Sequence, residues 1–419
     1  MVKTTLNLIF FAIIGLQSII AQNIKDETLE YKYIKLPLTP LSKSITNYQS
    51  TIFAPYEAEN KKKLDQYELD KKAADVTYEK DKQDYAVKLK AAQDTYAAEM
   101  AAWEKKSMAE KVIEKQVLNE NNKPVLHAPS QPYLHSVEKP ILQTSYDYPS
   151  LASTYLILDG YNNQADNAVK IEVTIYGFDY THPRQLTEVK DVASSVNGVK
   201  SVSKVTYYHI EFSYRHTMSI KVTGPDGKEI FNLTPQELNT YKIYKTGETN
   251  TSQSINEEML VKMHEEKILQ ENLTFINNLV NDKIGFKRET RKTSLSYVKT
   301  KDDIYTDLLV AYNDAIAGTK LLVDDNATAK TKIQGSIDAW TNALKESDLN
   351  DRKARIDKHV TLMIYFNLLE AYFAVGDIAN YEKIITTLNT LPISATERKL
   401  KESYEAIFND LKKRKAANQ

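Results

Sequence analysis

The chain has 419 residues, which is enough for two or three domains at roughly 150 residues each. Its 55 Lys and Arg nearly balance 56 Asp and Glu, and the net charge of −1 excludes the broad basic surface of nucleic-acid-binding proteins. The chain contains no cysteine, which excludes disulfides, thiol catalysis and thiolate metal sites.

A secretory signal peptide is expected over residues 1–21. Lys3 precedes an apolar run from Leu6 to Ala21, and a basic start, an apolar stretch and a small residue before the cut are typical of such peptides. The alternative is a membrane anchor, but the run has only about 16 residues where a spanning helix needs about 20. An exported protein without cysteine is expected in the periplasm or on the cell surface of a Gram-negative-type bacterium, with no transmembrane span after cleavage.

Residues 22–55 form an N-terminal segment with one predicted strand, from Tyr31 to Leu36. Pro37 and Pro40 follow it, and proline cannot donate a hydrogen bond to a neighbouring strand. We therefore do not expect this strand at the centre of a sheet.

Residues 56–117 predict one long charged helix. The stretch contains no Gly or Pro, is rich in Ala, and carries 13 Lys and 14 Asp or Glu, all strong helix formers except Asp. Acidic and basic side chains four residues apart, such as Glu57 and Lys61, support the same structure. A continuous helix of this length would reach roughly 90 Å.

An internal repeat runs through this helix, since residues 65–82 align with residues 83–100 without gaps. The repeat makes five whole turns of the helix, so repeated positions stay on one line. That line carries an aromatic stripe: Tyr67, Tyr78, Tyr85, Tyr96 and Trp103. The stripe predicts a docking rail for a protein partner in the envelope or for a second copy of the chain. The alternatives are packing against the protein's own body and a free rod in solvent.

Residues 118–150 form a proline-rich connector with five prolines, each of which discourages a helix before it. His127 and His135 lie here, eight residues apart in irregular chain, with no other ligand type at a metal-binding spacing. We expect both to be exposed and no metal site to form.

Residues 151–300 predict an antiparallel β domain, because apolar and polar residues alternate, for example over residues 169–176 and 207–214. A helix is expected to interrupt the domain from about 254 to 281, beginning with the capping box Ser254-Ile-Asn-Glu257. Residues 287–299 then alternate as a strand, which we expect to return to the β domain. A sandwich or meander is the expected architecture.

The polar face of these strands carries a second set of candidate residues: Tyr176, Tyr207, His209 and Glu211. Exposed aromatic rings suit a carbohydrate- or peptide-binding face, but Tyr is also simply a favoured strand residue. His209 and His216 are seven residues apart, so on one strand they face opposite sides and cannot share a metal ion.

The C-terminal region, residues 301–419, predicts helices at about 303–323, 327–346, 351–375, 378–390 and 395–416. Residues 367–377 resemble the first helix and turn of a tetratricopeptide repeat, with four packing and turn residues where that pattern has them: Leu368, Ala371, Tyr372 and Gly376. Residues 337–344 resemble a second repeat helix, so that the resemblance covers about 303–416. It implies a stack of helix pairs with a groove for a peptide or partner protein.

The sequence contains no P-loop, dinucleotide fingerprint, nucleophile elbow or His-Glu-x-x-His motif, so no catalytic residue or cofactor is predicted. The expected fold class is α+β, with a β-sandwich-like domain, a long charged helix before it and a repeat-like helical stack after it. The expected function is a non-enzymatic interaction or scaffold protein of a bacterial envelope assembly, secretion or motility apparatus. Two alternatives remain: a glycan-binding accessory protein that uses the β-sheet face, and a hydrolase whose carboxylates are distant in sequence.

Overall fold

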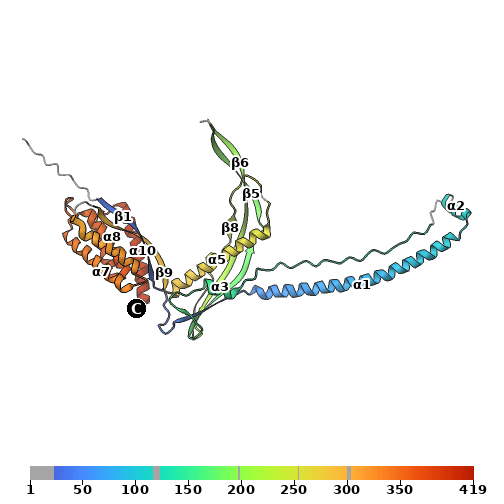
Figure 1. Ribbon diagram of the computed structural model, residues 1–419, viewed down its shortest axis with the longest axis horizontal. Coiled ribbons are helices and arrows are strands. Elements are labelled where there is room, and N and C mark those ends of the chain that lie inside the picture. The colour runs from blue at the N-terminus through green and yellow to red at the C-terminus, as the bar shows by residue number, and fades with distance from the viewer. Residues whose placement is uncertain (1–22, 117–122, 197–198, 253, 300–302) are drawn as a thin grey trace, which may run out of the picture.

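The computed structural model describes residues 23–116, 123–196, 199–252, 254–299 and 303–419. Half of the chain is helical and a quarter is in strands, with mostly antiparallel sheets. Figure 1 shows a sheet at the centre, a stack of helices beside it, and a long rod that points away from both. The signal peptide predicted over residues 1–21 lies outside the described residues.

The central sheet has seven strands in the order β3-β2-β4-β6-β5, with β7 and β8 also paired to β6. The strands are β2 (Asn47–Phe53), β3 (Asn162–Asn163), β4 (Ala168–Tyr180), β5 (Arg184–Val196), β6 (Val199–Thr223), β7 (Glu229–Leu233) and β8 (Lys242–Lys245). β2, from the N-terminal segment, runs parallel to β4. The sequence prediction missed β2, and the sheet is therefore mixed rather than purely antiparallel.

Helices, and not a second sheet, cover the central sheet among the described residues. The apolar side of α5 (Glu257–Ile284) packs on β4 and β6, with Leu273 and Ile276 fully buried, and the short α3 (Tyr148–Tyr155) extends this layer. On the opposite face, Lys170 and Glu172 are exposed. The expected sandwich is thus wrong for this part of the chain, because α5 supplies the apolar surface that a second sheet would supply.

The start of α5 differs from the prediction, and α4 (Gln236–Asn239) likewise follows a Thr three residues before a Glu, Thr234 before Glu237, that does not cap it. The N-cap of α5 is Asn256, whose side chain accepts a hydrogen bond from the Met259 amide (3.0 Å), and Ser254 lies before the helix. The one-turn helix α4 has Pro235 at its N-cap, which offers no capping side chain. A Ser or Thr three residues before Glu therefore marks the neighbourhood of both starts but not the capping residue.

The rod begins with α1 (Tyr56–Glu104), which starts where the sequence predicts but ends at Glu104, well before the predicted end at residue 117. A shorter helix, α2 (Met108–Gln116), follows after a break. Ser107 and Glu110 explain the break: the serine hydroxyl accepts from the Glu110 amide (3.3 Å), and the Glu110 carboxylate accepts from the Ser107 amide (2.7 Å). This capping box begins a new helix inside the charged stretch.

The C-terminal region is a stack of antiparallel helices in which each packs on the next in sequence. Its elements are η1 (Asp303–Tyr305), α6 (Thr306–Leu321), α7 (Asn326–Ala343), η2 (Leu344–Glu346), α8 (Lys358–Val375), α9 (Ile378–Thr390) and α10 (Ala395–Ala417). Their bounds agree with the predicted helices to within a few residues, except at the start of α8. Ser394 and Glu397 form the predicted capping box of α10.

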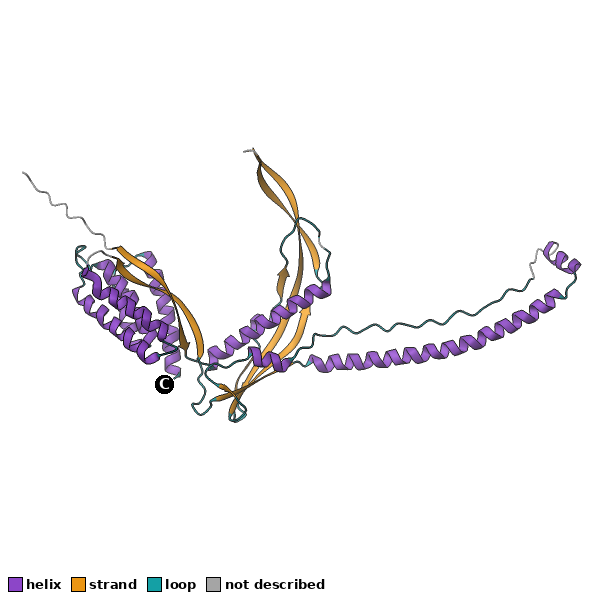
Figure 2. Cartoon of the chain, viewed as in Figure 1, coloured by secondary structure: helices purple, strands orange, loops and turns teal. Residues whose placement is uncertain are grey.

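A separate two-stranded ribbon lies on the helical stack. β1 (Asn23–Lys35) pairs with β9 (Lys287–Lys299) in antiparallel register along the whole length of both strands. The prediction that residues 287–299 return to the β domain is wrong, because Leu295 and Val298 of β9 are buried in the core of the helical stack. Figure 2 shows the ribbon between the sheet and the helices.

Arg414, near the end of α10, joins the stack to the rest of the molecule. Its buried guanidinium donates to the Leu36 carbonyl (2.8 Å), to the Asp282 carboxylate of α5 (2.8 Å) and to Asp410 (2.8 Å). Burial lowers the pKa of Arg414, but these acceptors outweigh the burial, so its pKa is raised. The basic end of the chain thus holds the stack against α5. No described helix is both long and apolar enough to cross a bilayer.

Candidate functional site

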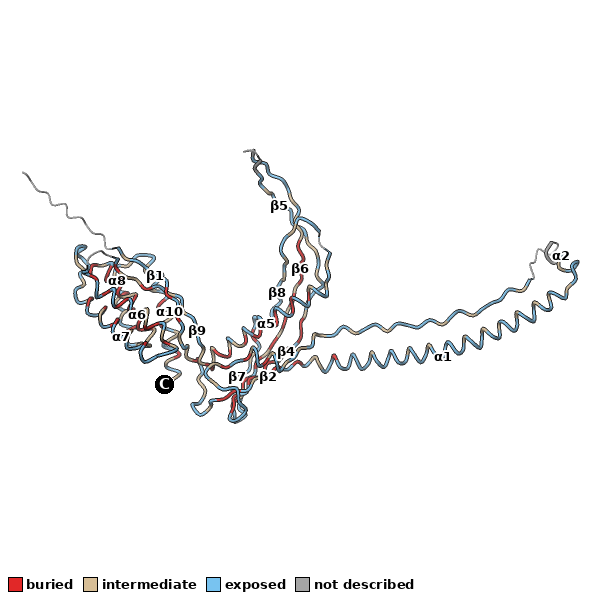
Figure 3. The backbone as a smooth tube through the Cα atoms, in the orientation of Figure 1, coloured by how far each residue is buried: buried red, intermediate tan, exposed pale blue. Residues whose placement is uncertain are grey.

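The aromatic stripe of α1 is half-buried along its whole length, although the helix projects far from the body. Of the described residues 61–105, all are exposed except the five aromatic residues of the stripe and four that flank them: Ala74, Leu89, Ala92 and Met100. Figure 3 shows how exposed the rest of the rod is. Something therefore covers one face of the helix and leaves the others in solvent.

The chain's own connector lies along that helix. Figure 1 shows residues 123–147 running beside α1 from the tip of the rod back to the sheet. At the base, the Asn60 side chain donates to the Gln143 carbonyl (2.8 Å) and accepts from the Gln143 amide (3.1 Å). The Tyr148 hydroxyl also donates to Glu57 (2.5 Å). These bonds fix where the connector leaves the helix.

A second contact fixes the connector at the tip. The Lys123 ammonium lies 5.8 Å from the centre of the Trp103 ring, and Lys111 of α2 lies 4.3 Å from the same ring. A lysine above an aromatic face is attracted by the ring's negative π-cloud. Trp103, the last member of the stripe, thus meets both the connector and α2.

The distance between the two contacts determines the conformation of the connector. From Asn60 to Trp103, α1 covers about 65 Å at about 1.5 Å per residue. The twenty steps from Lys123 to Gln143 must rise about 3.2 Å each to cover the same length. This is close to the rise of polyproline II, which the prolines favour. The connector is therefore a nearly straight second strand of the rod.

The same rise aligns the prolines of the connector with aromatic residues of the stripe. Measured from Trp103, Pro132 lies at about 29 Å and Tyr85 at about 27 Å, while Pro140 and Tyr67 both lie at about 54 Å. Each of these prolines is half-buried, as is Pro124 beside Trp103. The helix and the connector therefore have repeats of nearly the same physical length, since one 18-residue helical repeat and eight extended residues each span about 26 Å.

Two further half-buried connector residues, Pro129 and Val137, fall midway across the wider gaps between the aromatic rings. Measured along the rod from Trp103 with about 1.5 Å per helical residue and about 3.2 Å per connector residue, Pro129 lies at about the level of Ala92 and Val137 at about the level of Ala74. Both alanines are half-buried. Of the three interpretations of the stripe, these alignments favour packing against the protein's own chain.

The second set of candidate residues does not form one site. Tyr176 is exposed and its hydroxyl lies 3.1 Å from the Ser219 hydroxyl, whereas Tyr207 lies opposite Glu188 on β5. Along β6, positions 207 and 219 are about 40 Å apart. His209 is buried, which corrects its expected place on the wet face, and its ring lies 3.9 Å from the Glu211 carboxylate.

His216 lies on the covered face of β6, opposite His209 as expected, and packs edge-on against Phe178. Neither ring nitrogen has a hydrogen-bond partner among the described residues, and burial lowers its pKa to about 4. His264 of α5 is enclosed nearby by the rings of Tyr214, Tyr244 and Phe212. Sequence patterns give no sign of this aromatic cluster, because its members come from four separate elements, β4, β6, β8 and α5.

The pKa of His216 predicts acid sensitivity of the sheet. The unfolded chain takes up a proton at His216 near pH 6.5, whereas the folded chain does so only near pH 4. The unfolded state therefore binds more protons between these values, and this residue should lower the free energy of unfolding by about 3 kcal/mol from pH 7 to pH 4. Urea unfolding of His216→Phe should show a correspondingly weaker pH dependence; equal slopes for the variant and the wild type would contradict the assignment.

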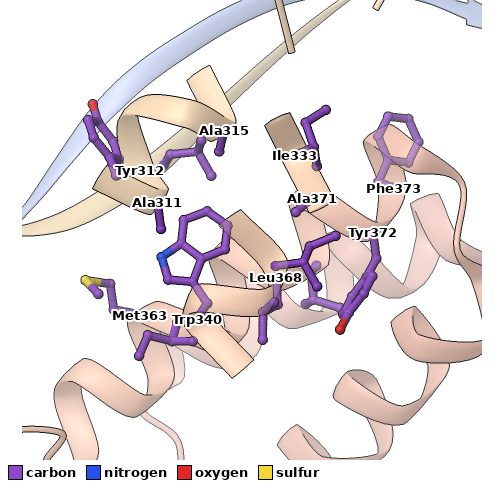
Figure 4. Packing of buried hydrophobic residues seen from close by; sticks show 14 of the residues in the cluster. Ala311, Tyr312, Ala315, Ile333, Trp340, Met363, Leu368, Ala371, Tyr372 and Phe373 are labelled. Atoms are coloured by element: carbon purple, nitrogen blue, oxygen red, sulfur yellow. The ribbon is translucent and has the colours of Figure 1, made fainter. Parts of the chain in front are cut away.

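The residues that carry the repeat resemblance lie in the core of the stack. Leu368, Ala371 and Tyr372 are buried, and Gly376 ends α8 in the left-handed region (φ 72°). Figure 4 shows Leu368 and its neighbours around the indole of Trp340. A side chain at position 376 would also meet the Lys415 ammonium, which donates to the Gly376 carbonyl. The left-handed backbone at this turn favours glycine.

Leu368→Ala should lower the free energy of unfolding of the stack by about 2–5 kcal/mol, the usual cost of deleting a buried leucine side chain. The urea midpoint measured by far-UV circular dichroism checks this. A suitable control is Leu400→Ala, since Leu400 is 41% exposed on α10 of the same stack. Equal midpoints for the two variants would show that α8 does not pack as described.

The groove that the resemblance implies is occupied by the chain itself. The ribbon packs on α6 and α8, which are the first helices of the two pairs. It also forms a hydrogen bond with α10, the final helix. On α8, the Asn367 side chain donates to the Ser296 carbonyl (2.8 Å) and accepts from the Ser296 amide (3.0 Å), as a neighbouring strand would. The expectation of an open groove for a partner peptide must therefore be corrected along the ribbon.

A buried carboxylate, Glu370, holds this arrangement together. It is fully buried on α8 and accepts two hydrogen bonds from Arg291 of β9 (2.6 Å each), one from Thr293 (3.1 Å), one from Tyr404 of α10 (3.1 Å) and one from Tyr31 of β1. Burial, followed by the charge of Glu370, raises the pKa of Tyr31 well above its usual value. Sequence reasoning missed this cluster; the one signal was an acidic residue inside the apolar run 368–373.

A cavity of about 540 Å³ opens where β1 leaves the stack. Its walls include Phe373, Ile407 and Leu411. Two of the cations at its edge, Arg291 and Arg414, are already paired with Glu370 and Asp282. The cavity lies at the junction of the ribbon and the stack, and its walls carry both apolar and charged side chains.

No group of three or more potential metal ligands occurs among the residues that the structure describes. No protein-family model, curated protein or solved structure matches this chain.

Proposed function

We propose that this protein is a non-enzymatic scaffold of the bacterial cell envelope that is exported to the periplasm or cell surface and holds partner proteins of an assembly, secretion or motility apparatus. The observation that carries the proposal is the rod. The 49 residues of α1 extend about 73 Å, with the connector packed along one face. A stiff spacer of this kind suits a protein that keeps its binding surfaces apart.

The architecture of the remaining chain supports the same role. The helical stack resembles tetratricopeptide repeats, which commonly bind proteins, and its far side is formed by α7 and α9. The glycan-binding alternative loses its support, because Tyr176 and Tyr207 are far apart and His209 is buried. No observation on the described residues favours the hydrolase alternative.

A crosslinking pull-down from envelope fractions tests the proposal. Because Asn60 and Gln143 are hydrogen-bonded to each other, residues 61–142 can be replaced by a short Gly-Ser linker without separating the ends. We expect the full chain to recover specific partner proteins. A partner that is recovered with the full chain but not with the variant without the rod is bound by the rod. Absence of any specific partner, or a mature protein in the cytosol that still begins at Met1, would contradict the proposal.

A further inference from the structure

The connector carries exposed apolar residues at regular intervals along the rod. Its sequence repeats every eight residues, as Pro124-Val-Leu-His, Pro132-Tyr-Leu-His and Pro140-Ile-Leu-Gln. The prolines are half-buried, whereas the two residues after each of them are exposed. The exposed fractions are Val125 66%, Leu126 39%, Tyr133 71%, Leu134 42%, Ile141 87% and Leu142 37%. We call these six residues the outer ridge.

The outer ridge is unusual for a surface exposed to water. Between Lys123 and Glu138 the connector carries no Asp, Glu, Lys or Arg, in contrast to the densely charged helix beside it. The six residues form three apolar pairs, separated along the chain by exposed polar residues such as Gln131 and Ser136. Single exposed apolar residues need no explanation, but apolar pairs repeated at even spacing along one segment commonly mark an interaction site. The connector must also remain extended, because its ends are fixed at Trp103 and Asn60.

We propose that the outer ridge is the interface of an antiparallel dimer of two rods. The three units are evenly spaced, eight residues or about 26 Å apart. A two-fold axis at the middle unit, Tyr133 and Leu134, therefore places Val125 of each copy opposite Ile141 of the other. The first unit of one copy then faces the third unit of the other, and the two middle units face each other. Such a self-complementary surface is what a two-fold interface requires.

The area and charge of the ridge agree with a second copy as its occupant. The six side chains expose roughly 600 Å² per rod, somewhat below the about 800 Å² per partner of a standard interface. An uncharged surface also meets its own copy without repulsion. The dimer is thus expected to be concentration-dependent, and it would point the two sets of sheets and helical stacks in opposite directions.

This dimer extends the proposed scaffold function without depending on it. If the protein dimerises but no partner protein is recovered with it in the pull-down, the interface stands and the scaffold role is wrong. If the protein is monomeric but partner proteins are recovered with it, the scaffold role stands and the interface is wrong. The two proposals can therefore fail separately.

Single cysteines test the interface directly, because the chain contains none. In the full chain, Leu134→Cys lies at the two-fold axis and should form a disulfide with its own copy under mild oxidation. Val125→Cys should not, since the two copies lie about 50 Å apart, but it should form one when mixed with Ile141→Cys. Val87→Cys is the control, because Val87 is 70% exposed on the side of α1 opposite the stripe.

We expect Leu134→Cys, and the mixture, to crosslink at least tenfold faster than the Val87→Cys control. Leu134→Asp should also remove the dimer in sedimentation velocity, whereas Val87→Asp should not. Crosslinking of Val125→Cys with itself would show a parallel pair and overturn the antiparallel arrangement. Rates at the control level for all ridge positions, with a monomer at every concentration, would overturn the interface altogether, and vesicle binding by that monomer would identify a membrane as the occupant.

Discussion

Glu370→Ala should lower the free energy of unfolding of the helical stack by about 3–5 kcal/mol, the usual effect of removing one partner of a buried ion pair. The substitution leaves the largely covered Arg291 guanidinium without its carboxylate and removes the acceptor of Tyr31 and Tyr404. These groups come from β9, β1 and α10, so the ribbon should separate from the stack before the helices unfold. Urea unfolding, with hydrogen exchange of residues 23–35, measures both effects.

Two matched variants separate charge from packing. Glu370→Gln keeps the size of the side chain and two acceptor sites but not the charge, so it should cost less than Glu370→Ala. The double variant Arg291→Met with Glu370→Leu replaces the pair by apolar side chains, which is often close to neutral. If Glu370→Ala unfolds at the wild-type urea concentration, this carboxylate does not hold the ribbon on the stack.

Changing Tyr78, Tyr85 and Tyr96 together to Ser should open the rod. Each ring has about 150–250 Å² of surface, and at about 25 cal/mol per Å² the partial burial of three rings contributes on the order of 5 kcal/mol. We expect faster hydrogen exchange over residues 61–104 and 123–142, with the sheet and the stack unaffected. The loss should occur in the monomer, because the connector runs beside α1 (Figure 1) and these rings are half-buried within the single chain.

The opposite side of the same helix supplies the control. Leu69, Val76 and Val87 are 60–71% exposed. Each is nine residues from a stripe residue, which is two and a half turns of the helix and therefore places it on the opposite side. Changing these three residues to Ser should leave exchange of the rod unchanged. Equal exchange in the two triple variants would mean that the aromatic stripe carries no packing energy.

Local sequence patterns predicted the helices well. The start of α1 at Tyr56, the turn at Gly376 and the capping box at Ser394 all follow from a few neighbouring residues. The end of α1 was missed because helix propensity was averaged over the whole charged stretch, whereas the break depends on Ser107 and Glu110 alone.

Contacts between distant segments could not be predicted in the same way. Nothing in residues 23–35 indicates that they pair with residues 287–299, because a strand pattern specifies which face is buried but not the neighbouring strand. Glu370 likewise acquires its role from Tyr31 and Arg291, which are 339 and 79 residues away. The mixed sheet was missed for the same reason, since β2 and β4 are separated by the entire rod.

The aromatic stripe was found from the sequence, but its covering was not. The helical repeat and the connector repeat differ in their number of residues, yet they have nearly the same length in space. Only the contacts at Asn60 and Trp103 show that the two repeats run side by side. A repeat in one segment is thus a reason to search neighbouring segments for a repeat of matching physical length.

Paired deletion in the rod tests whether the helix and the connector run side by side with matched repeats. Removing residues 83–100 from the helix together with residues 132–139 from the connector should shorten the rod by about 27 Å and leave Trp103 beside Pro124. Removing the helical residues alone leaves the connector eight residues too long. In small-angle X-ray scattering and hydrogen exchange, we expect the paired deletion to give a shorter rod with wild-type protection and the single deletion to lose protection of the connector. Equal protection in the two deletions would contradict the account.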